Sequence, residues 1–214
     1  MGNLFSSQAV QEALYITQHE IPFAIWETFY VTVFSTALAV VLGLPLGVLL
    51  VAGDKNGVLP LPKWLMSILN VVINLLRSIP FLILMIMVFP LSRLIVGTTV
   101  GTVATIVPLV VAAFPFVARL VESSLREVNP NIIEAAQSMG ASPMQIIVKV
   151  MIPESMPSLI SNLTIAITTI LGYSAMSGII GGGGLGKIAI NYGYYRYKYL
   201  VMVVAVILLI IMVQ

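Results

Sequence analysis

The segment GGGGLGK, from Gly181 to Lys187, has residue types that could bind the phosphates of a nucleotide. It nearly matches the pattern G-x4-G-K-[ST], in which glycine amides cradle phosphates and the final hydroxyl holds magnesium. Ile188 replaces that hydroxyl residue, and an apolar helical stretch rather than a strand precedes the glycines. We therefore expect no nucleotide here. The segment is interpreted as a flexible, extracytoplasmic re-entrant loop in which glycine permits close backbone packing.

Side chains that could form a catalytic or metal site are scarce. The chain has no cysteine, which excludes a disulfide, an iron–sulfur cluster, a thiolate zinc site and a cysteine nucleophile. His19 is the only histidine and has no evident partner, so a solvated or interfacial side chain is favoured over a catalytic base. Paired aspartates and a His-Glu-x-x-His helix are absent. The sequence therefore favours neither a membrane-embedded enzyme nor a metal site.

Four polar side chains form a stripe in the apolar stretch from Trp64 to Pro90. They recur at i, i+3, i+7 and i+10, on one face of a helix: Ser67, Asn70, Asn74 and Arg77. Such groups avoid lipid and face a bundle interior, a water-filled path or a partner subunit. A pathway or gate contact and a simple helix–helix contact both remain open. Ser78-Ile79-Pro80 should then break the helix, because proline lacks the N–H and clashes one turn back.

A second stripe lies in the stretch from about Leu159 to Ile180. Its members fall at i, i+7, i+11 and i+14, again on one face: Asn162, Thr169, Tyr173 and Met176. Polar, aromatic and thioether groups could line a pathway for a small amino acid, and methionine is flexible enough to pack as a gate. A helix–helix contact through the same residues is an equally good interpretation.

The most polar part of the chain, from Asn129 to Pro153, predicts two short helices joined by a turn. Asn129-Pro130 can begin the first helix, because asparagine caps and proline is tolerated at the first helical position. Gly140 suits the left-handed residue that ends many helices. Ser142-Pro143 repeats the cap, and Pro153 should close the second helix. Such a segment between two membrane spans is suited to being gripped by a partner outside the bilayer.

Composition indicates an all-α integral membrane protein. The chain is 59% hydrophobic and 8% charged, with mean hydropathy +1.08, whereas soluble domains carry about 25% charged residues. The net charge of +2 comes without a basic patch, so no nucleic-acid partner is expected. Hydropathy predicts five spans in one domain covering residues 1–214: about Phe29 to Ala52, Trp64 to Pro90, Val100 to Leu120, Leu159 to Ile180, and Leu200 to the end.

The termini carry weaker signals. A loose amphipathic pattern predicts a peripheral helix within residues 1–22, which Pro22 should end, and its apolar members are Leu4, Phe5, Val10, Leu14 and Ile16. No Lys or Arg occurs before Lys55, which favours an outside N-terminus. The last span is short, so we expect a short tail beyond Gln214. No acid lies in the middle of a span, which argues against a proton-coupled secondary transporter or a channel.

The segment EAAQSMGASPMQIIVKVMIP, from Glu134 to Pro153, resembles the EAA loop of ABC-importer permeases, whose pattern is EAA-x3-G-x9-I-x-L-P. In that family the loop is the coupling helix, which sits in a groove of a separate cytoplasmic ATPase subunit. The resemblance implies a type I importer permease with a cytoplasmic coupling loop over residues 129–153. The coupling residues that it implies are Glu134, Ala135, Ala136, Gly140, Ala141, Pro143, Val150, Ile152 and Pro153.

Further runs resemble the permease subunits of bacterial methionine importers. They are RSIPF at Arg77 to Phe81, Gly172-Tyr173-Ser174-Ala175-Met176, and GGGGLG followed by a Tyr/Gly-rich segment. The resemblance implies an inner-membrane homodimer, two ATPase subunits that use ATP and magnesium, and an extracytoplasmic methionine-binding protein. This chain itself would bind no cofactor. A permease for another amino acid or small solute is the alternative that remains open.

Overall fold

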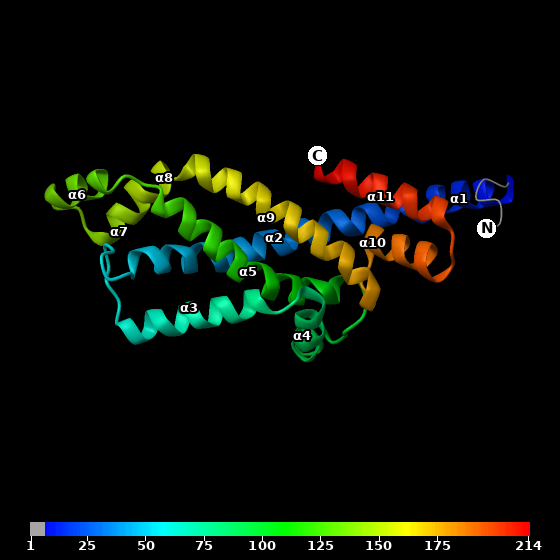
Figure 1. Ribbon diagram of the computed structural model, residues 1–214, viewed down its shortest axis with the longest axis horizontal. Helices are drawn as coiled ribbons and strands as arrows, with labels where there is room; N and C mark the ends of the chain where they lie inside the picture. The colour runs from blue at the N-terminus through cyan, green and yellow to red at the C-terminus, as the bar shows by residue number, and fades with distance from the viewer. Residues whose placement is uncertain (1–6) are drawn as a thin grey trace. The chain divides into compact units, whose positions relative to one another are not determined.

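The computed structural model describes residues 7–214, and every regular element in that range is helical. Figure 1 traces these elements from α1 to α11. The chain forms two compact units: one comprises the chain up to Ser35 with Phe81–Leu109 and Thr168–Gln214, and the other comprises Thr36–Pro80 and Val110–Ile167. Three long helices contribute residues to both units: α2 (Ile21–Ala52), α5 (Thr102–Arg126) and α9 (Met156–Ser177).

The first unit packs the N-terminal helix against the C-terminal one. Its remaining elements are α1 (Ser7–His19), α4 (Phe81–Val96), the 3-10 turn η2 (Gly178–Ile180), α10 (Gly184–Ile188), the π-helix η3 (Ala189–Tyr195) and α11 (Tyr199–Val213). Ala13 and Ile16 of α1 share a buried apolar cluster with Val201 and Ala205 of α11, and the two helices lie side by side in Figure 1. The expected N-terminal helix is therefore present from Ser7, whereas the predicted apolar residues at positions 4 and 5 lie outside the described residues.

The second unit is built on contact between α2, α3 and α5. Its other elements are α3 (Lys63–Ser78), α6 (Pro130–Ser138), α7 (Pro143–Ile146), the π-helix η1 (Ile147–Met151) and α8 (Ile152–Glu154). Leu50, Ile73 and Ala118 form its buried cluster. Gly47 of α2 lies so close to α5 that an added Cβ would be 2.6 Å from the Val121 Cβ. Glycine is needed there because any side chain would separate the two helices.

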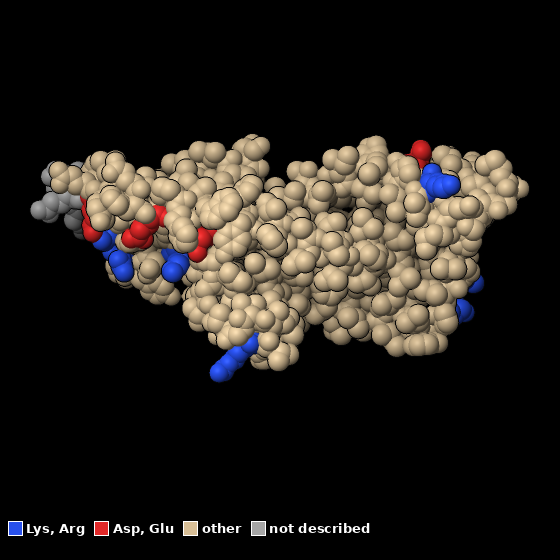
Figure 2. Space-filling view, turned by 180° about the vertical axis from the view of Figure 1, so that it is seen from behind, with Lys and Arg blue, Asp and Glu red and all other residues tan. Residues whose placement is uncertain are grey.

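Within residues 7–214, three helices are long and apolar enough to cross a membrane: α2, α5, and α9 with its 3-10 extension to Ile180. The pair α3 and α4 adds a fourth if the two count as one broken span, and α11 is shorter. The predicted break between α3 and α4 is confirmed, since regular helix stops at Ser78 and resumes at Phe81. On the face displayed in Figure 2, charged side chains form only a few groups on a mainly uncharged surface.

The expectation that Pro22 ends a helix is wrong. Helix α1 ends at His19 and α2 begins at Ile21, so Pro22 lies in the first turn of α2. Amides in the first turn of a helix have no intrahelical partner, so proline is accommodated there without losing a hydrogen bond.

Candidate functional site

The segment from 129 to 155, called here the capped segment, begins with the predicted asparagine cap. The Asn129 Oδ1 atom accepts a hydrogen bond of 3.0 Å from the Asn131 amide, and Pro130 is the first residue of α6. Gly140 has φ +76° and donates its amide to the Gln137 carbonyl at 2.9 Å. Both features are confirmed, and the glycine is needed because left-handed backbone is unfavourable for residues with a side chain.

The second helix of the capped segment begins with a full capping box. The Ser142 Oγ accepts from the Gln145 amide at 3.4 Å, while the Gln145 side chain accepts from the Ser142 amide at 2.9 Å. The sequence analysis found the serine but missed its partner Gln145. The signal was present, because Ser-x-x-Gln is the spacing of a capping box.

Pro153 does not close the second helix, which corrects the prediction. Helix α7 passes into the π-helix η1 and then α8, and the Ile152 amide donates to the Ile147 carbonyl five residues earlier. Proline normally clashes with the carbonyl four residues before it. The wider π turn is consistent with relief of that clash, so the chain continues helically to Glu154 and α9 starts after Ser155.

The capped segment has a buried face and a solvent-exposed face. Ala136, Ile146, Ile147 and Met151 are buried, whereas Met139 is 81% exposed. The predicted coupling residues divide accordingly: Ala136 is buried, Ala141, Val150 and Ile152 are half-buried, and Glu134, Ala135, Gly140, Pro143 and Pro153 are exposed. The exposed members and the large apolar side chains beside them offer a surface that a partner protein could cover.

Two members of the first polar stripe bind an arginine that the sequence analysis did not connect with them. Arg119 Nη2 of α5 donates to the Oδ1 atoms of Asn70 and Asn74 of α3, at 2.8 and 2.9 Å. Ser67 and Arg77, the other two members, are exposed. The stripe therefore makes a helix–helix contact at its centre, and i, i+4 spacing of the asparagines was the only local signal for it.

The second polar stripe is divided between two environments. The Asn162 Nδ2 donates to the Leu120 carbonyl at 3.2 Å and to the Ser124 Oγ at 2.8 Å, which is a contact between α9 and α5. Tyr173 stacks on Phe81 with ring centroids 4.4 Å apart. Thr169 is half-buried, and Met176 is 47% exposed. Asn162 thus takes the helix-contact role that the sequence left open.

The glycine-rich segment, Gly181 to Lys187, is a packed helix start rather than a flexible loop. Its amides are bound by side chains of α2: the Gly184 amide donates to Glu27 Oε2, and the Leu185 amide donates to Thr28 Oγ1, both at 2.9 Å. The hydroxyl of Thr102 in α5 also donates to the Glu27 carboxylate. The sequence analysis did not single out Glu27, because its partners Thr102 and Gly184 lie 75 and 157 residues away along the chain.

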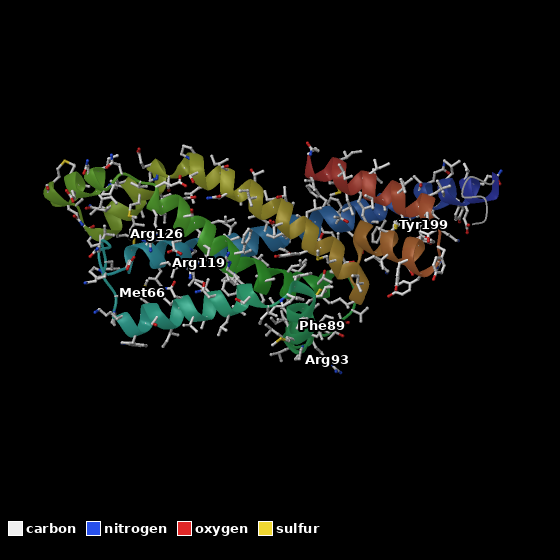
Figure 3. All side chains as sticks on the ribbon, in the orientation of Figure 1. Met66, Phe89, Arg93, Arg119, Arg126 and Tyr199 are labelled. Atoms are coloured by element: carbon white, nitrogen blue, oxygen red, sulfur yellow. The ribbon has the colours of Figure 1, made fainter. Side chains whose placement is uncertain are left out.

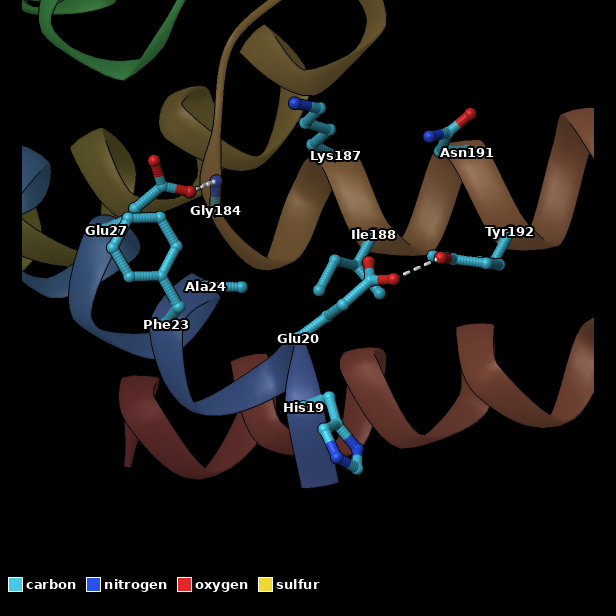
Figure 4. Close-up of a pocket in the computed structure, with 10 residues that line it drawn as sticks. All are labelled: His19, Glu20, Phe23, Ala24, Glu27, Gly184, Lys187, Ile188, Asn191 and Tyr192. Carbon is cyan, nitrogen blue, oxygen red and sulfur yellow. Dashed lines mark hydrogen bonds between the residues drawn. The ribbon is translucent and has the colours of Figure 1, made fainter. Parts of the chain in front are cut away.

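A cavity of about 340 Å³ adjoins this helix start. Figure 4 shows Glu20 and Glu27, just before and within α2, facing the helical stretch that carries Lys187 of α10 and Asn191 of η3. The Tyr192 hydroxyl donates to Glu20 Oε1 at 2.6 Å. That hydrogen bond, more than burial, raises the pKa of Tyr192 above its ordinary value. Both carboxylates in the cavity are thus already hydrogen-bonded by the chain itself.

Comparison with known proteins gives concordant matches over most of the chain. Residues 39–214 match the family described as the binding-protein-dependent transport system inner membrane component. The probable D-methionine transport system permease protein MetI of Vibrio cholerae is 50% identical over 192 residues, which are 89% of this chain and 84% of that protein. The D-methionine transport system permease protein MetI of Escherichia coli K12 is 46% identical over 154 residues, covering 72% and 70% of the two chains.

Solved structures agree with this assignment. A structure described as an inward-facing conformation of the MetNI methionine ABC transporter is 44% identical, with a TM-score of 0.88 over 90% of this chain and 89% of that chain. An amino acid ABC transporter structure at 19% identity has a TM-score of 0.71 and shows the shared fold alone. By its family match and its relatives, the chain belongs to the inner membrane components of binding-protein-dependent transport systems.

Proposed function

We propose that this chain is the membrane-spanning permease subunit of an ATP-driven importer of methionine, in the D form, the L form or both. The observation that carries the proposal is the capped segment, with its two caps, its left-handed Gly140 and its exposed outer face. The methionine assignment is supported by relatives that are named for D-methionine transport, such as those that are 50% and 46% identical.

The assembly that fits this function contains two copies of the chain, two cytoplasmic ATPase subunits and an extracytoplasmic methionine-binding protein. The capped segment is the proposed dock for the ATPase, because Met139 and Met144 are 81% and 66% exposed and Ala135 is exposed in the same segment. ATP binding would bring the ATPases and the docked segments together and open the pathway outward, and hydrolysis would reset it. ATP and magnesium belong to the ATPase, since the amides of the glycine-rich segment are taken by Glu27 and Thr28.

The proposed topology has five spans in a single permease domain, with the N-terminus outside and lipid around the helices. The spans are α2, the broken pair α3 and α4, α5, α9 and α11. The N-terminal segment 1–22 is peripheral, and residues 129–153 form the cytoplasmic coupling loop. Cysteine labelling from either side of sealed vesicles tests the topology. Labelling of Met139→Cys from the extracytoplasmic side would contradict it.

The proposed pathway uses the outer part of α9. Thr169, Tyr173 and Met176 would face a central water-lined path, because polar groups exposed to hydrocarbon cost about 1–3 kcal/mol each. Cysteines at these three positions should react with a membrane-impermeant thiol reagent in an outward-open complex. Ile167→Cys is the matched control, because Ile167 is 40% exposed on the opposite face and should stay unlabelled if it faces lipid. Equal labelling at all four positions would contradict this assignment.

The function itself is tested by reconstituting the complex in vesicles with its ATPase and binding protein. We expect ATP-dependent accumulation of methionine, and ATP hydrolysis that methionine-loaded binding protein stimulates. Screening the other amino acids in the same vesicles measures selectivity. Accumulation of a different amino acid in preference to methionine would support the importer function and contradict the assignment of methionine as its substrate.

A further inference from the structure

A continuous chain of polar contacts runs along the last two turns of α5. Arg119 Nη1 donates to Glu122 Oε2 at 2.6 Å, while Arg126 donates to the Oε1 atom of the same carboxylate at 3.0 Å. Arg126 also pairs with Asp54, in the connection between α2 and α3, at 3.0 Å. Figure 3 labels Arg119 and Arg126 on α5 and Met66 on α3. With the two asparagines of α3 added, the contacts link three parts of the second unit.

The contacts at Arg119 and Glu122 are the part of this network that costs the most free energy to shield from water. The side chains of Arg119 and Glu122 are only 20% and 13% exposed, whereas those of Arg126 and Asp54 are about half exposed. A shielded ion pair is retained only when its remaining donors and acceptors are satisfied. Asn70 and Asn74 do this for Arg119, because both place a carbonyl oxygen on the same guanidinium nitrogen.

The contacts lie close in sequence to the capped segment, so they can pass its movement on to α3. Helix α5 ends at Arg126, and α6 of the capped segment begins only four residues later at Pro130. A force applied to the capped segment therefore reaches the end of α5 through this short connection, as it reaches the start of α9 directly after Ser155. Any helix fixed to that end will follow it, and the Arg119 contacts fix α3.

We propose that Arg119 is a positioning residue that holds α3 on α5 through Asn70 and Asn74, so that α3 moves with the capped segment during transport. The proposal rests on the proposed importer function. It assigns to Arg119 no contact with the transported solute. The proposal predicts uncoupling. When the contact is removed, the ATPase continues to hydrolyse ATP, but α3 no longer moves with the capped segment.

The first experiment replaces the polar contact by a covalent one in the reconstituted complex. The chain has no native cysteine, so Asn74→Cys with Arg119→Cys offers this chain's only two thiols. Before bridging, solute imported per ATP hydrolysed should fall about fivefold or more, the range of ordinary coupling energies. A short bifunctional maleimide should then restore most of it. Loss that bridging does not restore, or no loss before bridging, would overturn the proposal.

Two further variants guard against simple misfolding. Asn70→Leu with Asn74→Leu removes the two acceptors on α3, together with the Asn70 bond to the Met66 carbonyl of the same helix, and leaves the Arg119–Glu122 pair in place, so it should uncouple in the same way. Arg93→Gln is the matched control, because Arg93 is exposed on α4, and its import per ATP should be unchanged. An equal loss in Arg93→Gln would show that removal of a positive charge alone explains the effect.

A second readout does not depend on which solute is carried. Spin labels at Ile68→Cys and Ser123→Cys, two exposed positions on α3 and α5, report the spacing of the helices. The distance distribution should stay narrow with and without ATP, and it should broaden when Arg119→Gln is added. If the complex imports no methionine but the distribution still broadens, the substrate assignment fails and the positioning role stands. An unchanged distribution in Arg119→Gln would refute the positioning role.

Discussion

The capped segment and the glycine-rich segment both contain a glycine-linked helix start, at α7 and at α10, yet different parts of the chain hold these starts in place. In the capped segment, Asn129 and Ser142 bind amides two and three residues away, and Gly140 has no heavy atom within 4 Å of an added Cβ. In the glycine-rich segment, the amides are bound by Glu27 and Thr28, each 157 residues away along the chain.

The two segments therefore differ in kind. The capped segment is an exposed surface, whereas the glycine-rich segment is a packed contact with α2, called here the closed joint. The caps of the capped segment are local, so its helices can keep their shape while a partner covers the exposed face. The start of α10 is not held by local caps. Its amides donate to side chains of α2, and its glycines lie in close contact with neighbouring parts of the chain. Substitutions should therefore affect binding in the first segment and folding in the second.

Gly186→Ala should have the largest effect. An added Cβ would lie 2.5 Å from the Ala175 Cα, and backbone cannot move aside as a flexible side chain can. Ordinary overpacking costs about 1–3 kcal/mol, but here backbone itself would have to separate, so we expect the packing of α10 on α9 to be lost, with a much lower thermal midpoint and poor yield from the membrane. Gly172→Ala is the matched control, because Gly172 lies within α9 with no heavy atom within 4 Å of an added Cβ. A similar loss in both variants would remove the close contact as the cause.

Glu27→Ala should have the next largest effect. It leaves the Gly184 amide and the Thr102 hydroxyl without their acceptor, and each unsatisfied group in a shielded site costs about 1–3 kcal/mol. Glu27→Gln keeps one acceptor oxygen and should lose less. The control is Glu12→Ala, because Glu12 is half exposed in its ion pair with Lys198 and such pairs contribute about 0–1 kcal/mol. Thermal unfolding of the complex measures all three, and equal midpoints for Glu27→Ala and Glu12→Ala would contradict the joint.

This contrast also explains what could be predicted from sequence. The caps at Asn129 and Ser142 and the turn at Gly140 were correct, because each depends on residues within a few positions. The partners of Glu27 and Arg119 were missed, since no local pattern indicates which distant helix will supply them. Pro153 was misjudged for a third reason: a proline ends a helix only if the preceding turn stays regular, and here a π turn precedes it.

Gly140→Pro should act on partner binding with little effect on folding. Proline fixes φ near −65°, where the chain has +76°, and it removes the amide bonded to Gln137. We expect normal membrane insertion with loss of the ATPase subunit on purification, and the bulkier side chain of Ala135→Leu should obstruct docking in the same way. Gly97→Pro is the matched control: Gly97 has φ +82° and donates its amide to the Arg93 carbonyl at 3.0 Å, far along the chain from the capped segment. Full ATPase retention in Gly140→Pro would refute the proposed dock.

Lys187→Ala should have the smallest effect, although it adjoins Gly186. Its side chain is exposed at the rim of the cavity in Figure 4, so truncation should change stability by no more than about 0.5 kcal/mol. ATP-driven uptake should also be unchanged, because the amides that a phosphate would need are already bound by Glu27 and Thr28. Uptake and photolabelling of the purified chain with an ATP analogue test this together. Labelling that Lys187→Ala abolishes would mean that the glycine-rich segment is a nucleotide site after all, and that the closed joint opens during transport.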